Sequence, residues 1–120
     1  MGWGELLPRA EEAIGVRYKL ATYSLALDHA EGGPKARGFA LILGISLASI
    51  DYLETVIKAE ILKTLITATR SNPPHGINCV VEFPIEGIGK RTGIVVTLRT
   101  VWLVSEVEAA PRLLSALLKP

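Results

Sequence analysis

The hydrophobic pattern of the chain changes its period once, at residues 71–76, and this change constrains the fold more than any other feature. Before it, from residue 50 to residue 66, apolar side chains recur every three or four positions, the spacing of one helix face. After it, Cys79, Val81, Phe83 and Ile85 alternate with their neighbours, the spacing of one strand face. The intervening Ser-Asn-Pro-Pro-His-Gly interrupts both patterns. The sequence therefore predicts a helical part followed by a β part.

The helical part is expected to contain several pieces. Residues 1–15 form a lead that is irregular or weakly helical, and residues 16–27 are ambiguous between helix and strand. A loop at residues 28–34 precedes a helix from Lys35 to about residue 43. The clearest helix covers residues 50–69, with Ser49 as its N-cap.

The β part is expected to be a meander. Residues 79–85 and 94–105 are strands joined by a glycine-rich turn at 87–93, and another turn follows at 106–111. Residues 112–118 form a third strand or a short closing helix. Because the connections are short, adjacent strands should pair antiparallel. We therefore expect an α+β fold, with N-terminal helices packed on a C-terminal antiparallel sheet of three or four strands. It forms a single domain over 1–120, mainly helical at 16–70 and with strands at 77–118.

Composition excludes several classes of protein. The chain has 120 residues, of which 49% are hydrophobic, so it can bury a core. A net charge of +1 excludes a general polycation that binds nucleic acid or membranes, but it does not exclude a local basic patch. The single cysteine excludes an internal disulfide framework. The longest apolar run is shorter than the roughly 20 residues of a membrane-spanning helix. We expect a soluble cytoplasmic protein without a membrane partner, or export within a larger polypeptide.

The densest group of chemically useful residues lies at 29–37. Gly32 and Gly33 would let the backbone approach a phosphate, while Lys35 and Arg37 add positive charge at a helix start. His29 has the side chain best suited to acid–base chemistry near neutral pH. The alternative interpretation is a turn and helix entry, with a surface histidine paired to an acidic side chain of the same loop.

A second group lies on the long strand. Alternation places Thr100 on the core face and Arg99 on the exposed face, so both can serve one site only if the strand bulges. Arg99 either pairs with Glu82 across the neighbouring strand or binds a phosphate bidentately. Lys90 and Arg91, in the glycine-rich turn, are solvated charges or extend a basic path.

A metal site is not expected. His29, His75 and Cys79 could in principle bind zinc, but a fourth ligand is missing and Cys79 should point into the core. The sequence has no nucleophile elbow, no paired-cysteine motif and no dinucleotide fingerprint. We expect no cofactor.

Three segments resemble one family. Residues 27–39 resemble the His-Pro-x-Gly-Gly-x-Lys-Ala-x-x-Phe signature of a family of small bacterial domains of unknown function, with Ala30 in place of Pro and Gly38 in place of a larger residue. Residues 98–104 resemble its Arg-Thr-Val-Trp strand, and residues 111–116 its closing segment. The resemblance covers roughly residues 20–117.

The resemblance implies a function. Members of that family occur alone, beside a small partner protein, or at the end of larger toxin-like polypeptides. The order of elements is similar to that of the barnase–EndoU–colicin–RelE class of ribonucleases. A toxin-type ribonuclease is therefore implied, with RNA as substrate and a cognate small protein as a further partner.

Two hypotheses follow, and a small-molecule or anion sensor is a third. In a metal-independent ribonuclease, His29 would be the acid or base, Lys35, Arg37 and Arg99 would hold the phosphate, and Thr100 or Ser115 would orient a substrate oxygen. In the alternative, the chain is a non-catalytic interaction or oligomerisation module, such as half of a two-gene pair, and a homo-oligomer. A cleft that clusters His29, Lys35 and Arg99 would favour the enzyme, whereas scattered positions and an exposed apolar strip would favour the module.

Overall fold

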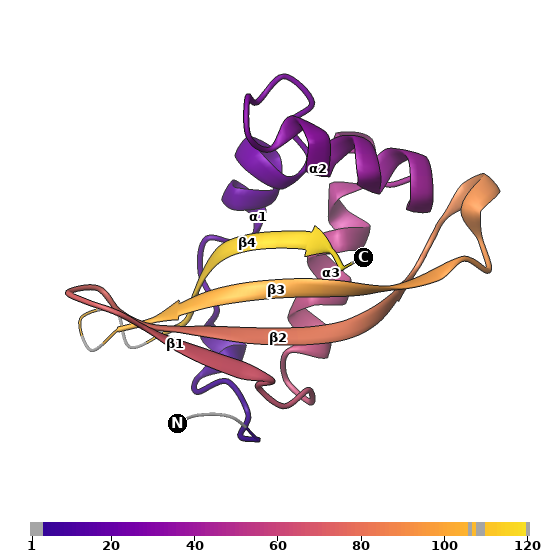
Figure 1. Cartoon of the computed structure of the whole chain (residues 1–120). Coiled ribbons are helices and arrows are strands. Elements are labelled where there is room, and N and C mark those ends of the chain that lie inside the picture. The colour runs from indigo at the N-terminus through magenta and orange to yellow at the C-terminus, as the bar shows by residue number, and fades with distance from the viewer. Residues whose placement is uncertain (1–3, 106, 108–109, 120) are drawn as a thin grey trace.

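A computed structural model of the chain has two layers, with helices on one side of a four-stranded antiparallel sheet (Figure 1). It describes residues 4–105, 107 and 110–119. The helices are α1 (Val16–Lys19), α2 (Gly33–Gly38) and α3 (Ile50–Glu60). π-Helical turns extend the first two helices: η2 (Leu20–Ser24) follows α1, and η3 (Phe39–Leu43) follows α2. Short 3₁₀ turns occur at η1 (Ala10–Glu12), η4 (Leu47–Ser49) and η5 (Gly89–Arg91).

The sheet is a meander in sequence order. Its strands are β1 (Ala68–Asn72), β2 (Gly76–Glu86), β3 (Val95–Val104) and β4 (Arg112–Leu118). The predicted α+β class is confirmed, and residues 112–118 form the fourth strand rather than a closing helix. In the register, Arg99 lies opposite Glu82 on one side and opposite Leu117 on the other.

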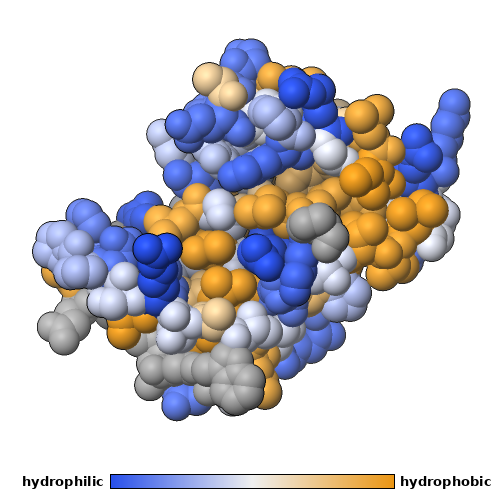
Figure 2. Space-filling model, viewed as in Figure 1, coloured by the Kyte–Doolittle hydropathy of each residue, from blue (hydrophilic) through white to orange (hydrophobic). Residues whose placement is uncertain are grey.

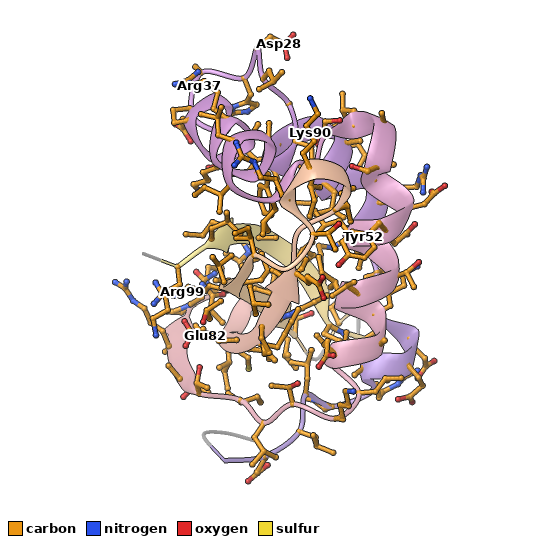
Figure 3. All side chains as sticks on the ribbon, turned by 90° about the vertical axis from the view of Figure 1, so that its right-hand side faces the viewer. Asp28, Arg37, Tyr52, Glu82, Lys90 and Arg99 are labelled. Carbon is orange, nitrogen blue, oxygen red and sulfur yellow. The ribbon has the colours of Figure 1, made fainter. Side chains whose placement is uncertain are left out.

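The core lies between the sheet and the helices. On β3 the side chains of Leu98, Thr100 and Trp102 are buried, as the alternation predicts. Phe39 of η3 and Leu53 of α3 are fully buried from the helical side. The other face of the sheet is open: Figure 3 shows Glu82 and Arg99 on the side of the sheet opposite α3.

The predicted helix over 50–69 is wrong in its second half. α3 ends at Glu60, the chain turns at residues 61–63, and β1 starts at Ala68. The Ile66 N–H donates to the Glu5 carbonyl, and the Gly4 N–H donates to the Ile66 carbonyl. Ile66 is therefore buried as part of an extended segment paired with the lead. It falls at the spacing of the helical apolar face by sequence position alone, which is why the pattern predicted a longer helix.

Two smaller predictions have different outcomes. The Ser49 hydroxyl does not cap α3; it bonds with the backbone N–H and carbonyl of Ser46, which closes η4. The first three residues of the predicted lead lie outside the described residues, as do residues 106, 108 and 109 of the turn predicted at 106–111.

The described part of the chain contains no single helix with the length and hydropathy of a membrane span. The segments Gly33–Leu43 and Leu47–Glu60, bent by 67° at their junction, reach that length and composition only as a pair.

Candidate functional site

The loop that carries His29 is held together by the imidazole itself. His29 Nδ1 accepts hydrogen bonds from the backbone N–H groups of Glu31 at 3.0 Å and Gly32 at 2.9 Å. The His29 carbonyl accepts another from the Gly33 N–H at 2.8 Å. These are the amides that were expected to cradle a phosphate, so the geometry gives them a different partner.

These hydrogen bonds also restrict the chemistry of His29. With two N–H groups donating to Nδ1, the proton of the neutral ring is assigned to Nε2. The ring also packs edge-on against Tyr23, with centroids 4.8 Å apart. The His29 ring thus organises the loop through Nδ1.

The double glycine allows a close approach between two backbone segments. A Cβ on Gly32 would collide with the carbonyl oxygen of Tyr23, and one on Gly33 would lie 2.7 Å from that of Leu27. Neither glycine has a positive φ, so space rather than backbone conformation demands them. They let α2 begin directly against the end of η2.

Lys35 is fixed over an aromatic ring. Its Nζ donates to the Tyr23 hydroxyl at 3.0 Å and lies 4.7 Å from the Tyr23 ring centroid. Lys35 also lines a groove of about 260 Å³ between α2 and the end of β4, together with Leu117 and Lys119. Arg37 lies at the top of the helical layer, well apart from Arg99 (Figure 3).

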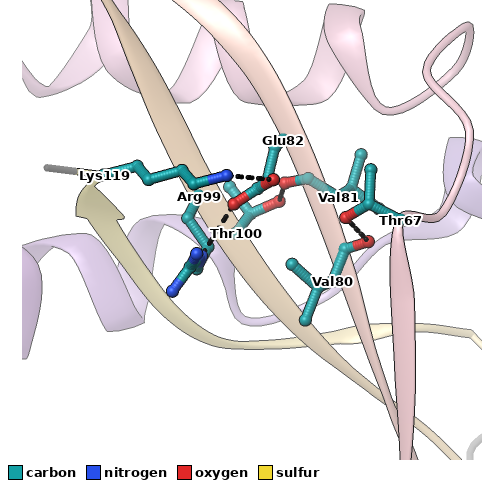
Figure 4. A network of polar contacts seen from close by, with 7 residues as sticks. All are labelled: Thr67, Val80, Val81, Glu82, Arg99, Thr100 and Lys119. Carbon is teal, nitrogen blue, oxygen red and sulfur yellow. Dashed lines mark hydrogen bonds and ion pairs between the residues drawn. The ribbon is translucent and has the colours of Figure 1, made fainter.

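The predicted cross-strand pair of Glu82 and Arg99 is confirmed, and it has a third member (Figure 4). Arg99 Nε donates to Glu82 Oε2 at 2.7 Å, and Lys119 Nζ donates to Glu82 Oε1 at 3.2 Å. The hydrogen bond from Arg99 lowers the pKa of the Glu82 carboxyl, and Lys119 adds to this against an opposing effect of burial. Glu82 is therefore an ionised carboxylate held between two cations at neutral pH.

A shallow cavity of about 450 Å³ borders this cluster on the open face of the sheet. Thr67 and Ala68 form one side of it, Val80 and Val101 the floor, and Glu82 and Arg99 the charged end. Figure 2, which faces this side, shows hydrophilic residues among hydrophobic ones over the strands. The side chains of Glu82 and Arg99 are 15% and 39% exposed, so a solute can reach both.

Thr100 faces the helices, away from Arg99. Its side chain is fully buried, its hydroxyl donates to the Val81 carbonyl at 2.7 Å, and it accepts from Trp102 Nε1 at 2.8 Å. The register shift between Val101 and Trp102 does not bring it round to the open face. The Thr100 hydroxyl thus ties β3 to β2 within the core. Ser115 lies opposite Val101, on the Arg99 side of the sheet.

The remaining candidates are scattered. Lys90 and Arg91 lie in η5, at the tip of the β2–β3 hairpin and apart from Arg99 (Figure 3). Cys79 is buried in β2, and burial raises the pKa of its thiol. Among the described residues, no group of three histidine, cysteine or acidic side chains could hold a metal ion.

The structure thus shows a charged cluster beside a cavity on the sheet, away from the His29 loop. From the sequence, Glu82 was expected only as a partner for Arg99, and no role was expected for Lys119. The strand alternation already placed Glu82 beside Arg99, which was the available signal. Lys119 gave none, because it joins the cluster only if residues 112–118 form a strand next to β3.

Fold and site together define a small α+β domain in which helices cover one face of a meander sheet and the other face carries an ion cluster beside a cavity. The chain belongs to the family described as a domain of unknown function, DUF6883, whose model matches residues 6–119. No curated protein and no solved structure matches it.

Proposed function

We propose that this protein is a metal-independent ribonuclease whose active site is the open face of the sheet at Glu82, Arg99 and Lys119. The observation that carries the proposal is the Glu82 carboxylate, held between two cations at the edge of an accessible cavity. Cleavage of RNA by its own 2′-hydroxyl needs a base for that hydroxyl and positive charge for the phosphorane-like transition state. The cluster supplies both.

The cations can hold a phosphate while still touching Glu82. Arg99 contacts Glu82 through Nε, which leaves most of the guanidinium N–H donors for a second anion. Lys119 likewise uses one of its ammonium protons on Glu82. A phosphate bound there draws positive charge away from the carboxylate and so strengthens Glu82 as a base.

The groups of the cluster can take up and return the one proton that the proposed step moves. Glu82 accepts the proton of the 2′-hydroxyl, the 2′-oxygen forms a bond to phosphorus, and the bond from phosphorus to the 5′-oxygen breaks. Lys119 gives that leaving oxygen a proton. The products are a 2′,3′-cyclic phosphate and a 5′-hydroxyl. Because Lys119 Nζ lies 3.2 Å from Glu82 Oε1, the proton taken by Glu82 can pass to Lys119 and restore both groups.

Two further lines support this proposal over a site centred on His29. The sequence resemblance implies a ribonuclease, and it places Arg99 within the matching strand segment. The Nδ1 atom of His29 is occupied by two backbone N–H groups, which disfavours that ring as a base. The proposal therefore keeps the predicted reaction and assigns the base to Glu82.

The test is cleavage of total tRNA by purified protein in the presence of a chelator. We expect wild-type cleavage, and a loss of about 100-fold or more in Glu82→Gln, because general acid–base groups contribute about 10²–10⁴-fold. Glu54→Gln is the matched control, since Glu54 is also held between an arginine and a lysine. No cleavage by wild type, or equal rates in the two variants, would contradict the proposal.

A second candidate, an oligomerisation module, is favoured by one observation. Leu41 of η3 and Val95 of β3 are 68% and 58% exposed. A hydrogen bond from the Ile88 N–H to the Leu43 carbonyl holds the hairpin against η3, so these side chains belong to adjoining elements. Figure 2 shows a broad apolar area on this side of the molecule.

The occupant proposed for this apolar area is a second copy of the chain. Sedimentation equilibrium should then show a dimer that Leu41→Glu converts to a monomer. A wild-type monomer at high concentration would exclude this candidate.

A further inference from the structure

The groove between α2 and the end of β4 adjoins the proposed active site. Lys119 lines the groove and also donates to Glu82, and Leu117, another lining residue, lies opposite Arg99 in the register. The groove therefore begins where the cluster of Glu82, Arg99 and Lys119 ends. A chain-like ligand bound at that cluster would pass directly into it.

The lining combines an apolar floor with positive charge. Ile42, Leu117 and Leu118 provide apolar surface, and the side chains of the cationic residues Lys35 and Lys119 line the groove beside them. Lys35 is held by the Tyr23 hydroxyl and ring, so its charge is positioned before any ligand arrives. Such a surface suits a ligand with a flat, weakly polar unit between two phosphates.

The size of the groove limits the ligand to one flat, weakly polar unit. Its volume of about 260 Å³ is below the roughly 300–1,000 Å³ of pockets for drug-sized molecules. The described residues that line it include no aromatic ring, so a base would lie on aliphatic side chains rather than stack. Recognition of this kind tolerates different bases.

We propose that this groove is a nucleoside subsite, which receives the nucleotide next to the phosphate held at Glu82 and Arg99 and places the following phosphate at Lys35. This inference rests on the proposed function and specifies its substrate as single-stranded RNA. A base can lie on the floor of the groove only after it has left the stack of a duplex.

Gly38 offers a way to close the groove without disturbing the fold. It lines the groove, its φ of −60° suits any residue, and a Cβ added there meets no atom within 4 Å. Gly38→Glu therefore adds bulk and negative charge inside the subsite, while replacing a poor helix former. Ala59→Glu makes the same charge change at an exposed position of α3 and is the matched control.

The experiment measures binding of a fluorescent 2′-O-methyl RNA of about 12 nucleotides, which cannot be cleaved because it lacks the attacking hydroxyl. We expect Gly38→Glu and Lys35→Ala to weaken binding about tenfold or more, Ala59→Glu less than twofold, and a duplex of the same sequence to bind more weakly. Thermal melts of each variant confirm that it is folded.

Each outcome decides the inference separately from the proposed function. No binding by wild type, equal binding by Gly38→Glu and Ala59→Glu, or equal binding of duplex and single strand would overturn the subsite. Cleavage of tRNA that is unaffected by Gly38→Glu would overturn it while leaving the ribonuclease in place. Binding that depends on Gly38 and Lys35, without any cleavage of tRNA, would keep the subsite and refute the ribonuclease.

Discussion

Two carboxylates in this protein are each held between an arginine and a lysine. Glu82 on β2 contacts Arg99 and Lys119, and Glu54 on α3 contacts Arg17 at 2.9 Å and Lys58 at 3.1 Å. Their side chains are 15% and 19% exposed. In both cases these partners lower the pKa of the carboxyl against an opposing effect of burial.

The difference lies in where the partners come from and what surrounds them. Lys58 is four residues from Glu54 on the same helix, a local pairing that stabilises α3, while Arg17 reaches Glu54 from α1. Arg99 and Lys119 come from β3 and from the residue after β4, and the cluster borders a cavity on the open sheet face. Similar ion pairs can therefore have different surroundings: the cluster on the sheet combines charge with a concave, accessible surface.

The largest expected effect concerns the two arginines. Arg99→Lys should lower kcat/KM for RNA cleavage by about 100-fold, because an ammonium cannot hold the carboxylate and a phosphate in the planar geometry of a guanidinium. Arg17→Lys should leave the rate unchanged. Steady-state kinetics on one tRNA substrate measures kcat/KM for both variants. Equal values would contradict a catalytic role for the sheet cluster that the helix cluster lacks.

The next effect concerns the support beneath the sheet cluster. Thr100→Val removes the acceptor for Trp102 Nε1 and the donor to the Val81 carbonyl, and leaves a buried indole N–H without its partner. We expect a loss of about 1–3 kcal/mol in the free energy of unfolding. Urea titration measures it. An unchanged free energy of unfolding would show that the strands beneath Glu82 and Arg99 do not need these two hydrogen bonds of Thr100.

A smaller effect separates stability from function. At pH 7, Glu82→Gln and Glu54→Gln should each lower the free energy of unfolding by only about 0.2–1 kcal/mol, since both clusters include well-exposed cations. Similar free energies of unfolding in the two variants, together with unequal rates of RNA cleavage, would show that Glu82 acts in the reaction and Glu54 does not. A far larger loss in Glu82→Gln would instead identify the sheet cluster as mainly structural.

The smallest effect is in the pH dependence of stability. Both folded-state pKa values lie below the unfolded value of about 4.3, so each contribution is complete above that pH and is lost as pH falls through the folded pKa. Thermal melts between pH 7 and pH 3 should therefore show a shallower decline in each glutamine variant than in wild type. Parallel curves would contradict the lowered pKa values.

The sequence predicted the parts of the fold that depend on local period. The helix beginning at residue 50, the two long strands and the pairing of Glu82 with Arg99 all follow from spacings of two, three or four residues. It did not predict β1, because Ile66 is buried through pairing with the N-terminal lead. Nor did it reveal that the His29 imidazole accepts backbone hydrogen bonds, since residue type does not specify which atoms meet.

The class of fold, the helix that begins at residue 50, the two long strands and the residues of β3 that face the core thus follow from the sequence. Tertiary packing alone brings Lys119 across β3 to Glu82 and makes α2 form a groove with the end of β4. The physical reason is that periodicity records which side of an element is buried. A cluster of residues 82, 99 and 119 depends on strand register and packing between segments far apart in the chain, which no local pattern encodes.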